Sequence, residues 1–476
     1  MRNGNVLVFI PWILFTVLAV GLLSFSLFYP KIHYGGDIVE YFGMTESVMR
    51  HGSVDLTPKD QFAIEERLGH GYFTNPEYYL TDLSGKRFAV HFPFYSLLNV
   101  PVRFFLNVVG LDAYLTFRVT NALILLGISA FILKKFLRDP WKQLVFLALI
   151  FTSPLVWFLV WPGPEVFSVT LILLALFSYS HGHQLRGIAV ASVASFQSQP
   201  LIIIPLTLLG VTFWRLGKRR ELSVKNIGAG ALQLLFMFVP NIYYAVVFGT
   251  YASHGRLLGV GFQNASLLKF WELLFDPNIG LFYYAPLICI FGLATLVLYL
   301  RKHGIGSLWL PVMFGLVSLL YLTNTNWNSG TAGYGPTRYA LPLIPLFIYM
   351  ILTTVKRSLV WILAISWLVV MQFPILRMNG YLSPTFENDK ILTPMAHYVL
   401  DNFPSWYNPT NEIFIERTGN REGGWDTAVY KSADGCKKVY VYKGNIEPAV
   451  RRCGFVPQPA LTRVLSDPMS SFYITY

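Results

Sequence analysis

The sequence predicts an α-helical protein that crosses a membrane about eleven times and ends in a small α+β domain. Three observations support this prediction. The chain of 476 residues is 54% hydrophobic and only 13% charged. Long apolar runs separated by short basic clusters recur from Val6 to Ile375, and the composition then becomes polar. Backbone groups in lipid must bond internally, so the apolar runs should be helices.

The apolar runs give the expected spans in order. Several of them are shorter than the roughly 20 residues that a full span needs. The expected spans are Val6–Tyr29, Tyr114–Leu133, Leu144–Trp161, Val166–Tyr179, Gly187–Phe196, Leu201–Trp214, Gly228–Phe248, Leu281–Leu300, Leu308–Tyr321, Tyr339–Leu352 and Leu359–Ile375.

Basic residues predict the orientation of these spans. They precede the first span and follow the second, fourth, sixth, eighth and tenth, so they share one side, which should be cytoplasmic. The clusters are Arg2, Lys134, Lys135, Arg138, Lys142, Arg186, Arg215, Lys218–Arg220, Lys225, Arg301, Lys302, Lys356 and Arg357. We therefore expect a multi-pass protein of the bacterial inner (plasma) membrane, with a cytoplasmic N-terminus and an extracytoplasmic C-terminus. The net charge of +12 reflects this topology rather than a nucleic-acid partner.

The first outer loop, residues 30–112, is long and mixed in character. Its stretch Phe92–Val109 is apolar but contains Pro93, Pro101 and Arg103. It fits either a further span or a helix lying along the outer interface. We favour the interfacial helix, because a span here would move the lysines after Leu133 to the wrong side.

The domains expected are a membrane module, residues 1–375, and an outer domain, residues 376–476. In the outer domain, Glu412–Glu416 and Val439–Tyr442 alternate in the way typical of short strands. Cys436 and Cys453 would form a disulfide if this domain faces an oxidising compartment. The domain is either a solvated lid or a part that shapes an acceptor site.

The stretch Lys31–Glu46 follows the first span and holds the first candidate site residues. Gly35 and Gly36 lead into Asp37, and Glu40 and Tyr41 follow. A helix from Ile38 onward would place Asp37 and Tyr41 on one face. Asp37 is either a catalytic carboxylate at the membrane boundary or an N-cap residue.

Arg338 opens an apolar run directly after a glycine-rich loop. Its guanidinium suits a phosphate held by paired, charge-assisted hydrogen bonds. The alternative is an arginine that reaches to the lipid headgroups. Asn326, Trp327 and Tyr334 in the same loop would add polar and stacking contacts to a substrate.

Three further outer residues are candidates with open alternatives. Glu165 follows Trp-Pro-Gly-Pro and is either a second carboxylate of the site or a first-turn acid favoured by the helix dipole. His91 either contacts a phosphate or sugar, or is an interfacial histidine without a special role. Gln199 either bonds across helices or reaches into the cavity.

The chain contains no H-E-x-x-H, no Cys/His cluster, no P-loop and no G-x-G-x-x-G. We therefore predict no nucleotide site, no cofactor and no dedicated metal centre, while a divalent metal is left open. The ionisable outer residues come from several distant segments and should meet at one membrane boundary, where such groups usually have a function.

The order of these segments resembles the GT-C superfamily of integral membrane glycosyltransferases, which includes protein O-mannosyltransferases and the aminoarabinose transferase of lipid A. The resemblance covers most of Val6–Ile375. It is carried by GGDIVEYFGMTESVMRHGSVDL, GKRFAVHFPFYSLLNVPVRFF, TSPLVWFLVWPGPEVFSVTL, DPNIGLFYYAPL and GYGPTRYALPLIPLF.

The resemblance implies inverting transfer of a sugar from a polyprenyl-phosphate donor to a hydroxyl of a glycan, lipid or protein outside the cytoplasm. It matches the family's loop carboxylate to Asp37, its late-loop arginine to Arg338 and its second acid to Glu165, where aspartate is commoner. Gln199 stands where many relatives have lysine, which argues against a cationic role there.

Two other functions compete with this expectation. A transporter or lipid flippase would place ionisable groups near mid-membrane and often has two related halves. The chain shows no internal repeat, and its candidate residues gather at one face. A non-catalytic scaffold would tolerate substitution of Asp37 and Arg338.

Overall fold

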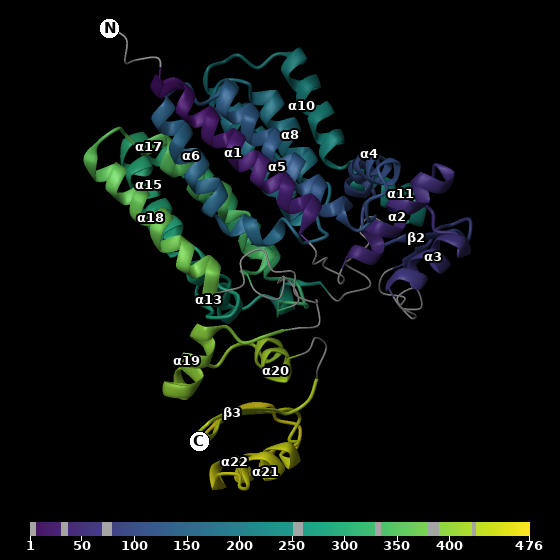
Figure 1. The fold of residues 1–476 in the computed structure, drawn as a ribbon, viewed down its shortest axis with the longest axis vertical. Helices are drawn as coiled ribbons and strands as arrows, with labels where there is room; N and C mark the ends of the chain where they lie inside the picture. Colours follow the sequence, from purple (N-terminus) through teal and green to yellow (C-terminus); the bar gives the residue numbers. More distant parts are fainter. Residues whose placement is uncertain are drawn as a thin grey trace.

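The computed structural model describes residues 6–29, 37–68, 79–250, 260–328, 335–378, 390–420 and 425–476. Most of these residues are helical, as predicted, and a smaller part that contains a sheet lies at one end of the helical bundle (Figure 1). Gly35, Gly36 and Tyr334, which the sequence singled out, lie outside the described residues.

The bundle is built from helices that follow the apolar runs of the sequence. Its longer helices are α1 (Val6–Phe28), α5 (Leu115–Lys135), α6 (Pro140–Thr152), α7 (Glu165–Ser180), α8 (Gln184–Ser195), α9 (Ile203–Lys218), α10 (Val224–Met237), α11 (Val239–Phe248), α15 (Pro286–His303), α16 (Trp309–Tyr321), α17 (Leu343–Thr354) and α18 (Leu359–Met378). Shorter elements connect them: η1 (Pro154–Phe158), η2 (Gln199–Ile202), η3 (Phe262–Asn264), α13 (Leu267–Phe275), α14 (Leu281–Tyr284), η4 (Ile305–Ser307) and η6 (Arg338–Ala340).

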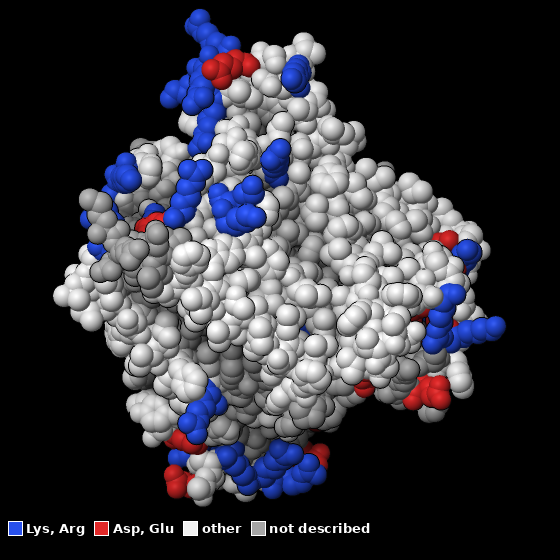
Figure 2. All heavy atoms as spheres, turned by 45° about the horizontal axis from the view of Figure 1, so that its top comes forward, with Lys and Arg blue, Asp and Glu red and all other residues white. Residues whose placement is uncertain are grey.

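The structure supports a membrane protein with fewer full-length spans than the sequence suggested. Among the described residues, five helices are long and apolar enough to cross a membrane, and the bent pair α10 and α11 would make a sixth. The expected count of about eleven is therefore not confirmed. Four apolar helices, Pro140–Thr152, Glu165–Ser180, Trp309–Tyr321 and Arg338–Thr354, are shorter. Figure 2 shows a broad surface of uncharged residues, with charged side chains gathered at the top, at the bottom and at the right of the view.

Prolines explain two of these differences. Ser153 is extended because Pro154 follows it, so α6 ends at Thr152 and the expected helix Leu144–Trp161 is interrupted. Pro240 stands in the first turn of α11, where α10 and α11 bend by 53°. The expected single span over residues 228–248 is therefore two helices.

The first outer segment forms α2 (Ile38–His51), α3 (Pro58–Leu68), the antiparallel pair β1 (Tyr79–Thr81) and β2 (Arg87–Ala89), and α4 (Phe94–Val108). Helix α4 occupies the stretch for which the sequence left two alternatives. It exposes Phe104 and Phe105, while its buried Arg103 pairs with Glu46 of α2. These contacts fit the interfacial helix, and its position along the membrane stays a prediction.

Aromatic packing fixes the start of α2 against the bundle. Phe42 stacks on Tyr114, with ring centroids 4.6 Å apart, and both belong to a core that includes Phe167 of α7. Tyr95 of α4 lies between α2 and α7 in the same core. This packing brings the first residues of α2 and α7 to the same end of the bundle.

Helix α1 is joined to the bundle at its C-terminal end by Arg118 of α5. The Arg118 guanidinium donates to the carbonyl oxygens of Ser26 and Tyr29, at 2.8 and 2.9 Å. A cation that bonds the last carbonyls of a helix satisfies groups without an intrahelical partner. The contact fixes where the chain leaves α1, shortly before Asp37.

The C-terminal domain contains α19 (Pro394–Asn402), η7 (Pro404–Trp406), α20 (Asn411–Gly419), α21 (Glu447–Cys453) and α22 (Gln458–Ser466). Its strands β3 (Ala428–Ser432), β4 (Gly435–Val441) and β5 (Phe472–Thr475) form an antiparallel sheet in that order, with Val439 opposite both Val429 and Ile474. The strand expected near Val439–Tyr442 is present as β4.

The expected strand Glu412–Glu416 is wrong, because these residues lie in α20. Ile413 belongs to the core of the bundle, while Phe414 and Ile415 belong to the core of the C-terminal domain. Helix α20 therefore lies between the two parts, and its three consecutive apolar residues contribute to two different cores.

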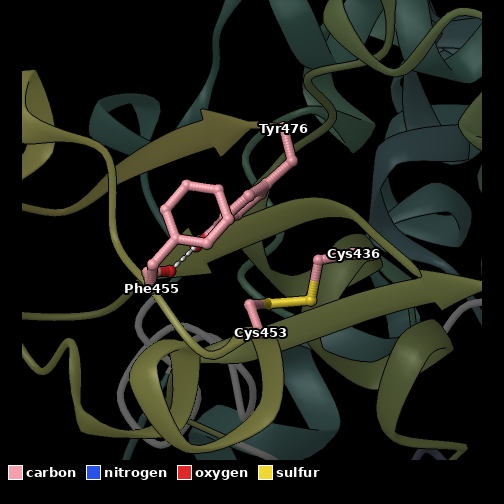
Figure 3. Close-up of a disulfide and its surroundings, with 4 residues drawn as sticks. All are labelled: Cys436, Cys453, Phe455 and Tyr476. Carbon is pink, nitrogen blue, oxygen red and sulfur yellow. Dashed lines mark hydrogen bonds between the residues drawn. A yellow bond between two sulfur atoms is a disulfide. The ribbon is translucent and has the colours of Figure 1, made fainter.

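A disulfide joins Cys436 of β4 to Cys453 at the end of α21, across 17 positions of the sequence (Figure 3). Close by, the Tyr476 hydroxyl donates to the Phe455 carbonyl oxygen at 2.9 Å (Figure 3). The two contacts hold α21, the segment that follows it and the last strand to the sheet.

We expect Cys436→Ser combined with Cys453→Ser to lower the free energy of unfolding of this domain by about 3 kcal/mol, because a closed loop of this length restricts the unfolded chain. Urea unfolding of the full chain, followed by proteolysis of the C-terminal domain, measures the change. Reductant should destabilise the unmodified chain to the same extent and leave the double variant unaffected. Equal stability of the two proteins without reductant would contradict the expectation.

Candidate functional site

Asp37 and Arg338, which are 301 positions apart in the sequence, meet directly. The Arg338 Nη1 donates to the Asp37 Oδ2 at 2.7 Å. Asp37 occupies the N-cap position of α2, but its side chain makes no capping hydrogen bond. The carboxylate is therefore engaged by the guanidinium rather than by the backbone of its own helix.

Glu165, the first residue of α7, completes a second contact to the same guanidinium. Its Oε1 lies 3.6 Å from the Arg338 Nη1. The carboxylate folds back over Gly163, where an added Cβ would overlap both this carboxylate and the Trp161 indole. The Trp-Pro-Gly-Pro turn thus needs glycine to bring Glu165 to Arg338.

The approach of Arg338 depends on the turn before it. Gly335 has a φ of +120°, a value that favours glycine, and an added Cβ would lie 3.2 Å from the Trp157 Cβ. Two residues later, the Thr337 hydroxyl accepts from the backbone N–H of Tyr339 at 3.4 Å and caps η6. Arg338 is therefore the first residue of a helical turn at the end of the bundle.

His91 lies beside Asp37 and is held by Glu40. The Glu40 Oε2 lies 2.7 Å from the His91 Nδ1 and also accepts from the His91 backbone N–H at 3.0 Å. The His91 Nε2 is 3.9 Å from the Asp37 Oδ2. The Tyr41 ring packs against the imidazole, with centroids 5.0 Å apart.

Two distant side chains support the segment that carries His91. The Tyr244 hydroxyl donates to the Val90 carbonyl oxygen at 2.9 Å, and the Gln197 Nε2 donates to that of Phe92 at 2.9 Å. They attach this outer segment to α11 and to the turn after α8. His91 is thus fixed from both sides.

The charge of His91 follows from its neighbours, which lie outside the spanning helices. Burial lowers the pKa of the imidazole, but the Glu40 and Asp37 carboxylates outweigh burial and raise this pKa from 6.5 to about 9. The imidazole is therefore protonated at neutral pH. The site contains three carboxylates, Asp37, Glu40 and Glu165, and two cations, Arg338 and His91.

We expect Glu40→Gln to lower the pKa of His91 substantially, because the charge that stabilises the imidazolium is removed. In the unmodified chain, the stabilisation from this pair is complete below pH 6.5 and is lost as the pH rises through about 9. NMR titration of histidine-labelled protein measures the change. Glu66→Gln, at an exposed carboxylate of α3, should leave the titration unaltered. An unaltered His91 titration in Glu40→Gln would contradict this account.

These groups face a cavity of about 380 Å³. Its charged end is formed by Asp37, His91, Glu165 and Arg338. Its other polar lining residues are neutral: Tyr41, Ser168, Gln197, Ser198, Gln199, Tyr244, Tyr321, Thr323, Asn324, Thr325, Asn326 and Tyr339. Its apolar lining comes from Phe92, Pro164, Val169, Phe196, Pro200, Leu201, Pro240, Val260, Leu320, Leu341 and Pro342. A cavity with one charged end and an apolar wall suits an amphiphilic ligand.

The remaining sequence candidates divide into those that line this cavity and those that do not. Tyr41, Gln199 and Asn326 line it, whereas Glu40 lies behind His91 and acts through it. Trp327 is fully buried and does not line the cavity; its ring stacks on Tyr339, with centroids 5.4 Å apart. The prediction for Tyr334 lies outside the described residues.

Several neutral residues that line the cavity were not among the candidates from the sequence. Ser198 and Tyr321 bond to each other at 2.8 Å at the cavity wall, and Tyr244 reaches it from α11. Ser198 lies between two glutamines in a break of the apolar pattern, which is a detectable signal. Tyr244 and Tyr321 lie within apolar runs, so nothing in the sequence separates them from core tyrosines.

Asp37, Glu40 and His91 each offer an atom that could ligate a metal, and these atoms lie within 4.8 Å of one another. The hydrogen bonds described above already pair Glu40 with His91, and the Arg338 guanidinium contacts Asp37. A divalent cation would have to compete with both positive side chains. The expectation of no dedicated metal centre stays a prediction.

Comparisons of the chain with protein-family models, with curated proteins and with solved structures find no match. The site is therefore interpreted from its geometry alone. It contains two carboxylates at the starts of helices, a guanidinium between them and a protonated imidazole.

Proposed function

We propose that the chain is an inverting glycosyltransferase of the GT-C type. It moves a sugar from a polyprenyl-phosphate donor to a hydroxyl acceptor on the non-cytoplasmic face of the membrane. The observation that carries the proposal is the contact between Asp37 and Arg338 beside Glu165 in one cavity. These are the three residues that the resemblance to the family selects.

The chemistry of this transfer needs the two kinds of group that meet here. A carboxylate takes the proton of the attacking hydroxyl, and a cation stabilises the phosphate on which negative charge grows. In the proposed step, Asp37 accepts the acceptor proton as the hydroxyl oxygen bonds to the anomeric carbon. The bond from that carbon to the phosphate oxygen breaks, and the electron pair leaves with the polyprenyl phosphate.

In the proposed mechanism, the ion pair with Arg338 keeps Asp37 engaged until the donor binds. A phosphate competes with the Asp37 carboxylate for the guanidinium, because both are anions suited to paired hydrogen bonds. Binding of the donor then transfers Arg338 to the phosphate and frees Asp37 to act as a base. Glu165 stays close to the guanidinium, and His91 supplies a second positive charge near Asp37.

The surroundings of the site support a lipid-linked donor. The cavity is lined by apolar residues as well as by the charged groups, and they include Pro240 at the bend between α10 and α11. A hydrocarbon tail fits such a wall, whereas a soluble nucleotide sugar has no matching phosphate loop in the sequence. We propose no cofactor, and the acceptor is a glycan, a lipid or a protein.

The test is transfer by the purified chain in liposomes that contain a labelled polyprenyl-phosphate sugar. Transfer to an added acceptor, with inverted anomeric configuration, is the expected result. The competing function is a lipid flippase, which would move the labelled lipid between leaflets and leave the sugar attached. Movement without transfer over a range of sugars and acceptors would overturn the proposal.

A further inference from the structure

Helix α20 of the C-terminal domain carries two acidic side chains that are almost completely buried. Glu412 and Glu416, one helical turn apart, have exposed fractions of 8% and 4%. Charged side chains are rarely buried unless they are paired. Both reach into the segment that precedes Arg338.

The carboxylate of Glu412 binds two consecutive backbone groups of this segment. Its Oε2 accepts from the Trp327 N–H at 2.7 Å, and its Oε1 accepts from the Asn328 N–H at 2.8 Å. Hydrogen bonds to an ionised acceptor are roughly twice as strong as neutral ones. One side chain of α20 therefore fixes the local backbone at two successive positions.

Both the nitrogen and the oxygen of the Asn328 side-chain amide bond to residues of the same helix. Its Nδ2 donates to the Glu416 Oε2 at 2.6 Å, and its Oδ1 accepts from the Arg417 Nε at 2.9 Å. Arg417 also donates to the Ile391 carbonyl oxygen at 2.7 Å. Asn328 and Arg417 are both almost fully buried.

The fixed segment is connected to Arg338 through Tyr339. The Trp327 ring stacks on the Tyr339 ring with an interplanar angle of 14°, and the Tyr339 hydroxyl donates to the Asn326 carbonyl oxygen at 3.0 Å. The Arg338 guanidinium lies 5.7 Å from the centroid of the same tyrosine ring. A shift of Trp327 would therefore move the residue adjacent to Arg338.

We propose that α20 is a positioning element of the site, with Glu412 as its principal positioning residue. It fixes the position of residues 324–328 relative to Arg338. These residues line or support one wall of the cavity. The C-terminal domain is then an integral part of the site rather than a separate lid. This inference rests on the proposed glycosyltransferase function.

The test compares Glu412→Ala with Tyr407→Phe in the full chain. Tyr407 also joins the C-terminal domain to the bundle, since its hydroxyl donates to the Asp276 Oδ2 at 2.9 Å and accepts from the Asn278 Nδ2 at 2.8 Å. Among the described residues, its hydroxyl makes no hydrogen bond to Trp327 or Asn328. Tyr407→Phe is therefore a matched loss of a contact between the same two parts.

Hydrogen exchange gives a readout that does not depend on the reaction. Glu412→Ala should raise the exchange rate of the amides of Trp327 and Asn328, and Tyr407→Phe should not. Glu412→Gln, which keeps one carbonyl acceptor, should lie between Glu412→Ala and the unmodified chain. Unchanged exchange in Glu412→Ala would overturn the role of α20, whatever the chain catalyses.

The transfer assay tests whether the positioning by Glu412 affects the rate of sugar transfer. Glu412→Ala should lower kcat by up to roughly 10²-fold, since small misplacements in a site have effects of this size. The loss should largely vanish when Arg338 is already replaced by alanine, because the two changes act on the same interaction. An additive loss, or a loss equal to that of Tyr407→Phe at the same thermal stability, would overturn the inference. Absence of transfer by the unmodified chain would instead overturn the proposed function.

Discussion

Asp37→Asn is expected to lower the rate of sugar transfer by roughly 10²–10⁴-fold. The substitution keeps the size of the side chain and an acceptor for Arg338, but it removes the base that takes the acceptor proton. The fold should persist, since the carboxylate makes no capping hydrogen bond to α2. The measurement is kcat for transfer from the polyprenyl-phosphate sugar in liposomes.

The matched control for this prediction is Glu66→Gln, which removes an exposed carboxylate of the same outer segment. It should leave kcat unchanged. Near-normal turnover of Asp37→Asn would remove Asp37 from the proposed mechanism, even if the chain transfers sugar.

Arg338→Ala is expected to reduce transfer by roughly 10²–10³-fold, the size typical of removing one group that stabilises developing negative charge. It also leaves Asp37 and Glu165 facing each other without the cation that each contacts, at 2.7 and 3.6 Å. Arg338→Lys should restore only part of the activity, because an ammonium cannot hold a phosphate in the two-pronged manner of a guanidinium. The measurements are kcat and the affinity for polyprenyl phosphate without its sugar.

A control for Arg338 is Arg377→Lys, at an exposed position near the end of α18, which should leave both quantities unchanged. The double variant Asp37→Asn with Arg338→Ala should lose less activity than the product of the two single losses, since residues that act as a unit are not additive. Unchanged affinity for polyprenyl phosphate in Arg338→Ala would contradict a phosphate-binding role.

The main residues of the site could be predicted from the sequence because they are ionisable residues in a chain that is otherwise dominated by apolar runs. Asp37, His91, Glu165 and Arg338 are ionisable residues at the edges of apolar runs, and one orientation of the helices puts them on one face. The structure brings all four into one cavity. Which of them pair with each other could not be read from the sequence, since the pairing depends on how the starts of α2 and α7 and the η6 turn come together in space.

The errors have identifiable physical causes. Apolar composition predicted helices correctly, but it did not show that two of the expected spans are interrupted at Pro154 and Pro240, and the count of about eleven spans is not confirmed. The alternation in Glu412–Glu416 suggested a strand, yet Glu412 binds Trp327, which is 85 positions away. A partner at that distance is invisible to a local pattern.

The separation of 301 positions between Asp37 and Arg338 has a consequence for biogenesis. The acidic groups Asp37, Glu40 and Glu165 emerge from the ribosome long before the guanidinium that neutralises them. Until Arg338 follows, His91 is the one positive partner described for this cluster, where it contacts Glu40 and lies 3.9 Å from Asp37, and Glu165 lacks the guanidinium that it contacts in the folded chain. The contact between Asp37 and Arg338 therefore forms only after the segment that carries Arg338 has been synthesised.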